Sequence, residues 1–591
     1  MIEGSANILD KILSVKNPKA DVVRMQQRRK GNNQWADMWD GKKHYMDMKS
    51  RTFKTGLLYY LDELAKANNI HEEVTWESEQ DDSIPHTLKS VEVPADLLYG
   101  VTLREYQIDT VKDNLKCYRG ISRNATNAGK TEMMAAMIKT ISLAYYQGEA
   151  RALVVVPGKT LVNQTADRFK LRLPEWEDDI GVMGDKQHEH GKMIVVATDS
   201  MVHSWLHSKD ATKRDAVIDM LCSANIMLMD EAHHGKSSSW IDIANICQAS
   251  FRYGFSGTPI TPAGAMASAN VDLVSVTGGQ LSYISNKFMI EHGYSAKPII
   301  IMTSVGEDDK KIRCHPVLKD PRPNSSCQVY RGDGVFAHGT LLRRQTKFDT
   351  LEDTNKIFKG MTPTQIKVKK TRLRKQKKYQ KSTGKSFVKV HGETEVVTSK
   401  QLITESYYDV FKMNYEESNR KVMAWAQVFA MCKLPSLMII RKILHGEMLS
   451  YWLSEKGVRN VFLSGGDDTD VRDKAFDQIA SGDLDLIIAT SIFDEGVDVP
   501  DLRGLILNSS GESYTKALQR IGRGVRAKKD GENVVYVVDT VDYQCDFLLQ
   551  DSLARLDYYD DEEFEVLNDQ EGVSTYFEEF TEFLKAEGIE V

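Results

Sequence analysis

Residues 124–131 read Asn-Ala-Thr-Asn-Ala-Gly-Lys-Thr, and residues 226–233 read Ile-Met-Leu-Met-Asp-Glu-Ala-His. The first stretch ends in Gly-Lys-Thr and precedes a strongly helical run over 132–146. This is the pattern of a Walker A loop, in which backbone N–H groups and a helix N-terminus hold phosphates. The second is an apolar strand that ends in adjacent carboxylates, which can lie beside a phosphate-bound metal. Together the two stretches predict ATP hydrolysis.

Each polar residue of this pair of motifs has an expected role. Lys130 would reach the β- and γ-phosphates, and the Thr131 hydroxyl would bind Mg²⁺. Asp230 would hold the same metal ion, and Glu231 would orient or deprotonate the attacking water. Asn124 replaces the usual first glycine of the loop. The nucleotide would also be held by the loop residues Asn127, Ala128 and Gly129.

Working outward from these motifs, short β-branched apolar runs alternate with longer helical segments from residue 101 onward. That alternation is typical of parallel sheets with crossover helices. Strands are expected at 152–156, 194–197, 226–229, 437–440, 486–489, 505–507 and 534–538. The pattern therefore predicts an α/β protein with two such domains, separated by a charged insertion.

Three arginines near the end of the chain could stabilise the negative charge of a phosphoryl group during its transfer. Residues 519–526 read Gln-Arg-Ile-Gly-Arg-Gly-Val-Arg. A guanidinium is always charged, and its fork fits phosphate oxygens. The position of this stretch, far from the Walker A loop in sequence, predicts a second domain that closes on the nucleotide. The alternative is a basic helix on the surface.

The composition is that of a globular protein. The chain has 591 residues, of which 41% are hydrophobic and 27% charged, which excludes disordered, collagenous and disulfide-stapled classes. No apolar run reaches the length of a transmembrane helix, and the N-terminus does not resemble a secretory signal. The seven cysteines form no CxxC pair, which argues against a disulfide framework and a zinc module. We expect a soluble cytoplasmic protein.

The formal net charge of −7 conceals charged segments of opposite sign. Residues 557–591 carry a net charge of −12, and residues 305–400 carry +13. Eleven basic residues and no acidic one lie between 367 and 389. Such a run binds polyanions or forms a solvated loop, and both interpretations stay open. The first 56 residues are also basic, and their interleaved aromatic residues suit either nucleic acid or a small hydrophobic core.

Seven stretches, read in order and including the arginine stretch quoted above, make the chain resemble a superfamily 2 helicase from about residue 100 to residue 540. They are Leu-Arg-Glu-Tyr-Gln at 103–107, Val-Val-Pro-Gly-Lys-Thr-Leu at 155–161, Val-Val-Ala-Thr-Asp-Ser at 195–200, Phe-Ser-Gly-Thr-Pro at 255–259, Leu-Met-Ile-Ile-Arg at 437–441, Ile-Ala-Thr-Ser-Ile-Phe-Asp-Glu-Gly-Val-Asp-Val-Pro at 488–500, and the arginine stretch at 519–526. Within the superfamily, the closest resemblance is to the UvsW-type branched-DNA helicases of phages and to RecG- and XPB-like translocases.

The resemblance implies two RecA-like lobes, ATP and Mg²⁺ as cofactors, and DNA as the partner, with no membrane. It also implies translocation on branched DNA such as replication forks and Holliday junctions, in the host cytoplasm if the chain is phage-encoded. Gln107 would read adenine, Asp498 would contact the nucleotide, and Arg523 and Arg526 would carry the arginine-finger role. Contacts to the nucleic-acid backbone would come from Pro157, Lys159, Thr198 and Thr490.

The expected domains are an N-terminal DNA-binding domain (1–97), a first lobe (98–304), a basic insertion (305–400), a second lobe (401–545) and an acidic C-terminal tail (546–591). The aromatic and acidic tail suggests DNA mimicry or a protein partner, and deleting 557–591 would then raise DNA affinity. The favoured alternative is a capping helix over 574–585. Three other functions stay open: an RNA helicase, a non-catalytic nucleic-acid scaffold, and a restriction-type translocase subunit, for which the sequence offers no nuclease carboxylate cluster.

Overall fold

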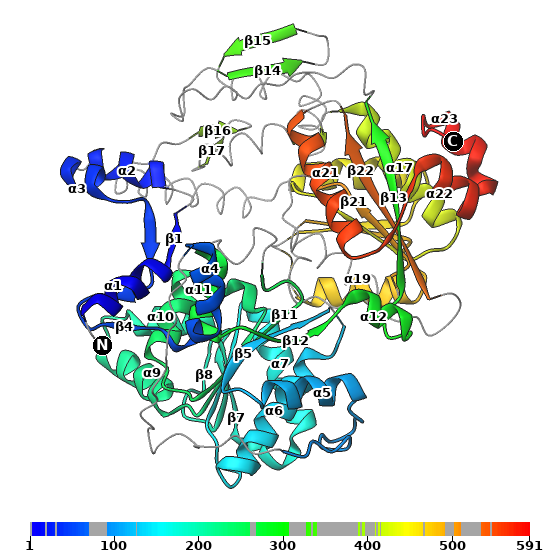
Figure 1. Ribbon diagram of the computed structural model, residues 1–591. Helices are drawn as coiled ribbons and strands as arrows, with labels where there is room; N and C mark the ends of the chain where they lie inside the picture. The colour runs from blue at the N-terminus through cyan, green and yellow to red at the C-terminus, as the bar shows by residue number, and fades with distance from the viewer. Residues whose placement is uncertain are drawn as a thin grey trace. The chain divides into compact units, whose positions relative to one another are not determined.

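The computed structural model divides the chain into two compact units, 1–294 and 295–591 (Figure 1). It describes residues 3–69 and 91–306 with breaks at 18–19, 30–31, 126 and 261–267, four short strands between 327 and 395, and residues 408–591. Within this last range the breaks are 409–411, 414, 465–466, 468, 491–501, 510–532 and 544–545.

The first unit is built on an eight-stranded sheet with the strand order β12-β5-β11-β10-β6-β9-β7-β8. All neighbouring strands are parallel except β7 and β8. The strands are β5 (Arg119–Asn124), β6 (Ala152–Val156), β7 (Ile180–Gly184), β8 (Gln187–His188), β9 (Ile194–Thr198), β10 (Ile226–Asp230), β11 (Phe251–Ser256) and β12 (Gln280–Ile284). The central strands are buried on both faces, which explains their continuous apolar runs.

Helices cover both faces of this sheet, so alternate residues of one strand enter different cores. Leu153 and Val155 of β6 pack with one core cluster, whereas Val154 and Val156 pack with the other. The helices are α5 (Glu105–Asn114), α6 (Lys130–Tyr145), α7 (Lys159–Arg172), η2 (Pro174–Asp179), α8 (Asp199–Leu206), α9 (Ala211–Ser223), η3 (Ala232–Lys236), α10 (Ser238–Ile246), α11 (Ser268–Thr277) and α12 (Asn286–Glu291).

The N-terminal segment shares a hydrophobic core with the first lobe, so the expected boundary at residue 97 does not separate two cores. Its elements are α1 (Glu3–Ile12), β1 (Ser14–Lys16), α2 (Ala20–Arg29), α3 (Asn33–Met38), β2 (Lys42–His44), β3 (Met46–Asp47), β4 (Thr52–Phe53), η1 (Thr55–Tyr60) and α4 (Leu61–Ala67). Leu57 and Leu61 pack with Val274 of α11. The Tyr45 hydroxyl lies 2.9 Å from both the Ser268 carbonyl and the Asp272 carboxylate, and these two acceptors share its single proton.

The second unit contains a seven-stranded sheet, all of whose neighbours are parallel, in the order β19-β20-β18-β21-β22-β13-β23. Its strands are β13 (Lys297–Val305), β18 (Ser436–Ile439), β19 (Asn460–Leu463), β20 (Leu486–Ala489), β21 (Gly504–Leu507), β22 (Val534–Asp542) and β23 (Glu565–Asn568). Its helices are α17 (Glu416–Met431), α18 (Ile443–Glu455), α19 (Thr469–Ala480), α21 (Asp546–Asp561), α22 (Asp569–Tyr576), η7 (Glu578–Phe580) and α23 (Thr581–Ala586).

The expected boundary at residue 304 is wrong, because β13 belongs to the second sheet. All nine residues of β13 pair with β22 in parallel, from Lys297 with Val534 to Val305 with Asp542. The strand is apolar and buried along most of its length, so it needs neighbours on both edges. It is separated from β22 by the whole basic insertion. The second lobe therefore begins before the insertion and is completed after it.

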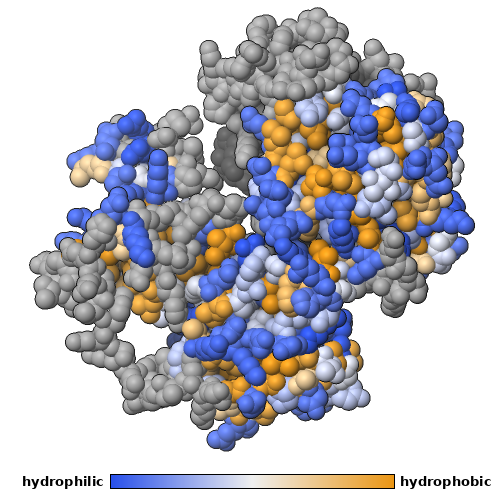
Figure 2. All heavy atoms as spheres, turned by 45° about the vertical axis from the view of Figure 1, so that its right-hand side comes forward, coloured by the Kyte–Doolittle hydropathy of each residue, from blue (hydrophilic) through white to orange (hydrophobic). Residues whose placement is uncertain are grey.

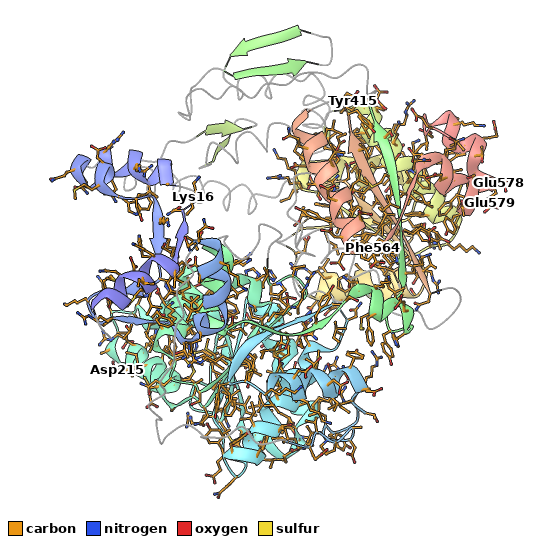
Figure 3. The ribbon with its side chains drawn as sticks, viewed as in Figure 1. Lys16, Asp215, Tyr415, Phe564, Glu578 and Glu579 are labelled. Atoms are coloured by element: carbon orange, nitrogen blue, oxygen red, sulfur yellow. The ribbon has the colours of Figure 1, made fainter. Side chains whose placement is uncertain are left out.

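The acidic C-terminal segment is not a detached tail. β23 pairs with β13, which places it at the edge of the second sheet. Val573, Phe577 and Leu584 are buried in the same core cluster as Trp425 of α17. Figure 3 shows Glu578 and Glu579 on the outer side of this segment. Glu578 and Glu579 thus lie on the solvent side of folded elements, whereas Asp569 of the same segment is buried. The expected helix over 574–585 is divided among α22, η7 and α23.

Two antiparallel hairpins lie in the insertion, and their strands are β14 (Cys327–Arg331), β15 (Val335–Gly339), β16 (Val388–Val390) and β17 (Glu393–Glu395). The basic run 367–389 lies outside the described residues apart from the start of β16. Within the described part of the chain, no helix is long and apolar enough to span a membrane. On the face drawn in Figure 2, hydrophilic and hydrophobic side chains are interspersed.

Candidate functional site

The phosphate loop connects the end of β5 to the start of α6. Gly129 is the N-cap of α6 and has φ +78°, in the left-handed region that favours glycine. A Cβ atom at this position would lie 2.3 Å from the Gln107 Nε2 atom. Asn127 is also left-handed, with φ +70°. The loop therefore turns sharply and presents the N-terminus of a 16-residue helix, an arrangement that binds phosphate groups.

Gln107 lies at this loop and holds it in place, and its expected contact with adenine stays a prediction. Its Nε2 donates to the Ala128 carbonyl at 3.0 Å, and its Oε1 accepts from the Arg104 backbone N–H at 2.9 Å. The Tyr106 hydroxyl donates to the same Ala128 carbonyl at 3.1 Å. Sequence reasoning missed this contribution of Tyr106, although the residue directly precedes the glutamine.

Asn124, where a glycine is usual, is fully buried at the end of β5. Among the described residues, neither its Oδ1 nor its Nδ2 has a hydrogen-bond partner. A buried amide without partners costs free energy, so native structures rarely keep one unless a ligand or water satisfies it. An unsatisfied amide at the base of a phosphate loop is consistent with a polar ligand there.

Asp230 is the last residue of β10, and Glu231 directly follows it. The Asp230 Oδ1 accepts from the Glu231 backbone N–H at 2.9 Å, and Glu231 has φ +48°, which is uncommon for a residue other than glycine. Burial raises the pKa of Asp230 to about 6, the charge of Glu231 adds to this rise, and the charge of Lys130 opposes it. Burial also acts to raise the pKa of Glu231, but the charges of Lys130 and His233 outweigh it and lower the pKa.

These shifts show that the charge of Lys130 acts on both carboxylates. The phosphate loop follows β5 and the carboxylate pair lies at the end of β10, and these parallel strands are separated only by β11, so both motifs lie at one edge of the sheet. Two adjacent carboxylates repel each other, and a cation between them and a phosphate would relieve that repulsion. The expected ligands, the Asp230 carboxylate and the Thr131 hydroxyl, offer oxygen atoms, which Mg²⁺ prefers. The residues therefore fit a magnesium–nucleotide complex.

A chain of polar contacts connects this pair to the next strand. The His233 Nδ1 lies 3.3 Å from the Glu231 carboxylate and 3.1 Å from the Ser256 hydroxyl at the end of β11. The Ser256 Oγ in turn accepts from the Thr258 backbone N–H at 3.2 Å. Sequence reasoning assigned no role to His233 or Ser256, although both lie within the motifs that it quoted. Their contact follows from the parallel pairing of β10 with β11.

The residues expected to contact the nucleic-acid backbone are divided between the two units. In the first unit, Pro157 follows β6, and Thr198 ends the neighbouring strand β9, where it pairs with Val156. The Thr198 side chain is buried, with 2% of its surface exposed. In the second unit, Thr490 follows β20 and is also buried. In this conformation both threonines can offer backbone groups rather than hydroxyls.

Four expected side chains cannot be placed. Asp498, Arg523 and Arg526 lie outside the described residues. The backbone of Lys159 begins α7, but its side chain is not described. The roles of these residues stay predictions.

Two family models match the chain in the order that the motifs predict. The family described as "Type III restriction enzyme, res subunit" matches residues 100–261, and the family described as "Helicase conserved C-terminal domain" matches residues 407–528. The first match contains the phosphate loop and the Asp230–Glu231 pair. The second contains the strands from β18 to β21.

Two relatives match about three quarters of the chain. "Putative helicase 22" of a Sulfolobus islandicus filamentous virus is 21% identical over 467 residues, covering 78% of this chain and 67% of the relative. "DNA 3'-5' translocase XPB2" of Sulfurisphaera tokodaii is 22% identical over 449 residues, covering 75% of this chain and 83% of the relative.

Solved structures with similar chains include bacteriophage T4 UvsW, at 18% identity and a TM-score of 0.36 over 96% of this chain and 95% of that one. The helicase domain of Pyrococcus furiosus Hef matches at 15% identity and a TM-score of 0.41, over 77% of this chain and 98% of that one. The ordered motifs, the two parallel-sheet units and the two family models together support an ATP-hydrolysing helicase of superfamily 2.

Proposed function

We propose that the chain is an ATP-dependent DNA translocase that unwinds or remodels branched DNA, such as replication forks and Holliday junctions, in phage replication, recombination or repair. The observation that carries the catalytic part of this proposal is the arrangement at the edge of the first sheet. There the phosphate loop with Lys130 follows β5, and the Asp230–Glu231 pair lies at the end of β10, which is parallel to β5 and separated from it only by β11.

In this proposal each residue of the first unit has one task. The N-terminus of α6 and Lys130 bind the phosphates, and Thr131 and Asp230 hold Mg²⁺, which neutralises charge on the phosphates when it is bound. Glu231 accepts a proton from the attacking water, for which its lowered pKa keeps it ionised. The contacts from Glu231 through His233 to Ser256 transmit the state of the carboxylate to β11.

The remaining roles extend the proposal beyond the described residues. Arg523 and Arg526 stabilise the transferring phosphoryl group, and Asp498 contacts the nucleotide. The nucleic-acid backbone is held by Pro157, Lys159, Thr198 and Thr490. Contacts of this kind give little sequence specificity, since they address phosphate and sugar rather than base edges.

DNA is favoured over RNA by the extent of the matches. The relative named as a DNA translocase matches 75% of this chain, whereas an RNA helicase, SrmB of Escherichia coli, matches 17% of it at 30% identity over 105 residues. The short match shows only that one motor segment is shared. The name of the family that matches 100–261 refers to a restriction enzyme, but that match covers one lobe.

The test of this proposal compares forked, four-way and linear substrates of identical sequence, made in DNA and in RNA. ATPase stimulation and strand displacement are measured for the full chain on each substrate. We expect stronger stimulation by DNA than by RNA, and displacement on branched DNA above that on linear duplex. Preference for RNA would establish the alternative of an RNA helicase. If the unchanged chain hydrolyses no more ATP than Lys130→Ala does, with or without nucleic acid, the chain is a non-catalytic scaffold.

A further inference from the structure

A cluster of possible metal ligands lies on the helices that follow β9 and β10. His203 and His207 are one helical turn apart at the C-terminal end of α8, and Asp242 lies on α10. The ligand atoms of the three side chains all lie within 4.8 Å of one another. The side chains are partly exposed, at 34% for His203, 58% for His207 and 41% for Asp242, so a dissolved ion can reach them. The proposed ATP site uses none of them.

The distances within the cluster fit a metal ion better than hydrogen bonds. The Asp242 Oδ2 lies 3.3 Å from the His203 Nε2 and 3.5 Å from the His207 Nε2. Hydrogen bonds between N–H and oxygen are about 2.7–3.2 Å long. Donor atoms bound about 2.0–2.2 Å from a tetrahedral Zn²⁺ are separated by about 3.3–3.6 Å, as the geometry of a tetrahedron requires. Both contacts to Asp242 fall within that range.

The relative placement of the two imidazole rings also fits a shared metal ion. Their centroids are 4.4 Å apart and the ring planes are inclined by 59°, so both rings address one carboxylate oxygen. Two imidazoles and a carboxylate are ordinary ligands of zinc. Three protein ligands leave a fourth tetrahedral position for water.

We propose that His203, His207 and Asp242 form a binding site for a divalent transition metal ion, with Zn²⁺ as the best match. A bound ion joins α8 to α10. The N-terminal ends of these helices are already joined, because the Ser239 hydroxyl donates to the Asp199 carboxylate at 2.9 Å. The ion would add a second connection further along. It would hold α8 and α10 together. α8 follows Thr198 of the proposed nucleic-acid contact, and α10 follows the turn that contains His233.

The test counts zinc ions bound to the full chain after treatment with a chelator and stepwise addition of Zn²⁺. A chromophoric chelator that competes for zinc reports both number and affinity. We expect His203→Ala and His207→Ala each to remove one ion or to weaken its binding by about tenfold or more, since even the loss of an outer hydrogen bond to a ligand costs that much. His292→Ala, which removes an exposed histidine directly after α12, should leave both quantities unchanged.

The design separates this site from other zinc ligands and from misfolding. Cysteine thiols add a background that all the variants share, so the difference of one ion is the decisive quantity. The circular dichroism spectrum of each variant should match that of the unchanged chain, since the substituted side chains are partly exposed. Substitution with Co²⁺ should give the visible absorption of a tetrahedral site in the unchanged chain only. Equal zinc binding by the unchanged chain, His203→Ala and His207→Ala would overturn the proposal.

Discussion

Replacement of Phe577 by alanine tests whether the acidic C-terminal segment is part of the second lobe. Phe577 is 3% exposed and lies on the C-terminal side of α22. Its ring centroid is 5.5 Å from that of Trp425, 5.9 Å from that of Phe429 and 5.0 Å from that of Tyr536. These partners come from α17 and β22, so Phe577 connects the segment to both a core helix and the sheet.

The expected loss follows from burial. A buried phenylalanine replaced by alanine costs about 3–5 kcal/mol, through lost transfer free energy and the cavity that remains. Contacts with three aromatic rings place Phe577 toward the upper end of that range. For a unit of this size each kcal/mol lowers the melting temperature by about 2–4 °C. Phe577→Ala should therefore lower the melting temperature of the second unit by about 10–15 °C.

The assay is thermal unfolding followed by tryptophan fluorescence, because Trp425 contacts Phe577 and reports on this core directly. Glu578→Ala is the matched control: the neighbouring side chain is exposed, and its loss should change stability by no more than about 0.5 kcal/mol. If Phe577→Ala melts within about 1 °C of the control, the segment does not contribute to the core. The same reasoning predicts that deletion of residues 557–591 unfolds the second lobe rather than merely raising DNA affinity.

Three further predictions concern buried polar groups. Burial raises the pKa of Asp569 to about 6, so the folded state binds this proton more tightly than the unfolded state does. The free energy of unfolding should therefore fall by about 3 kcal/mol as the pH rises from 4 to above 6. Urea unfolding of Asp569→Asn should lack this part of the pH dependence. Lys412 and Asp542 form a fully buried ion pair at 2.7 Å, so Lys412→Met should cost about 3–5 kcal/mol in urea unfolding, most of it regained in Lys412→Met/Asp542→Leu. Tyr45→Phe removes the hydroxyl that contacts Ser268 and Asp272 of α11, so it should lower the free energy of unfolding of the first unit by about 1–3 kcal/mol in urea. An unchanged unfolding free energy would show that the N-terminal segment does not pack against α11 through this residue.

The strands that carry the motifs were predictable because a parallel sheet buries both faces of its inner strands. Continuous apolar runs such as 152–156 and 486–489 therefore mark strands directly, and the structure confirms both within the same bounds. The phosphate loop was equally predictable. A sharp turn into a helix N-terminus restricts the residue types, and Gly129 is left-handed in the structure, as such a turn requires.

The sequence could not predict that β13 belongs to the second sheet, because the local pattern of residues does not specify which distant strand a given strand pairs with. Its pairing with β22 joins residues more than 200 positions apart. The C-terminal segment was misjudged for a different reason. Its net charge drew attention to the acidic residues, whereas the decisive feature is the burial of Val573, Phe577 and Leu584 between them. The contact between His203 and Asp242 also depends on tertiary packing, although the spacing of His203 and His207 by four residues was a readable signal.

The most direct test of the central claim is ATP hydrolysis by Glu231→Gln, which keeps the size of the side chain and removes its charge. A general base that accepts the proton of the attacking water contributes about 10²–10⁴-fold to the rate. We predict that kcat for DNA-stimulated hydrolysis falls by a factor in that range while ATP still binds. Asp215→Asn, on the exposed side of α9 (Figure 3), is the control and should hydrolyse ATP at the unchanged rate. An unchanged kcat in Glu231→Gln would contradict the account.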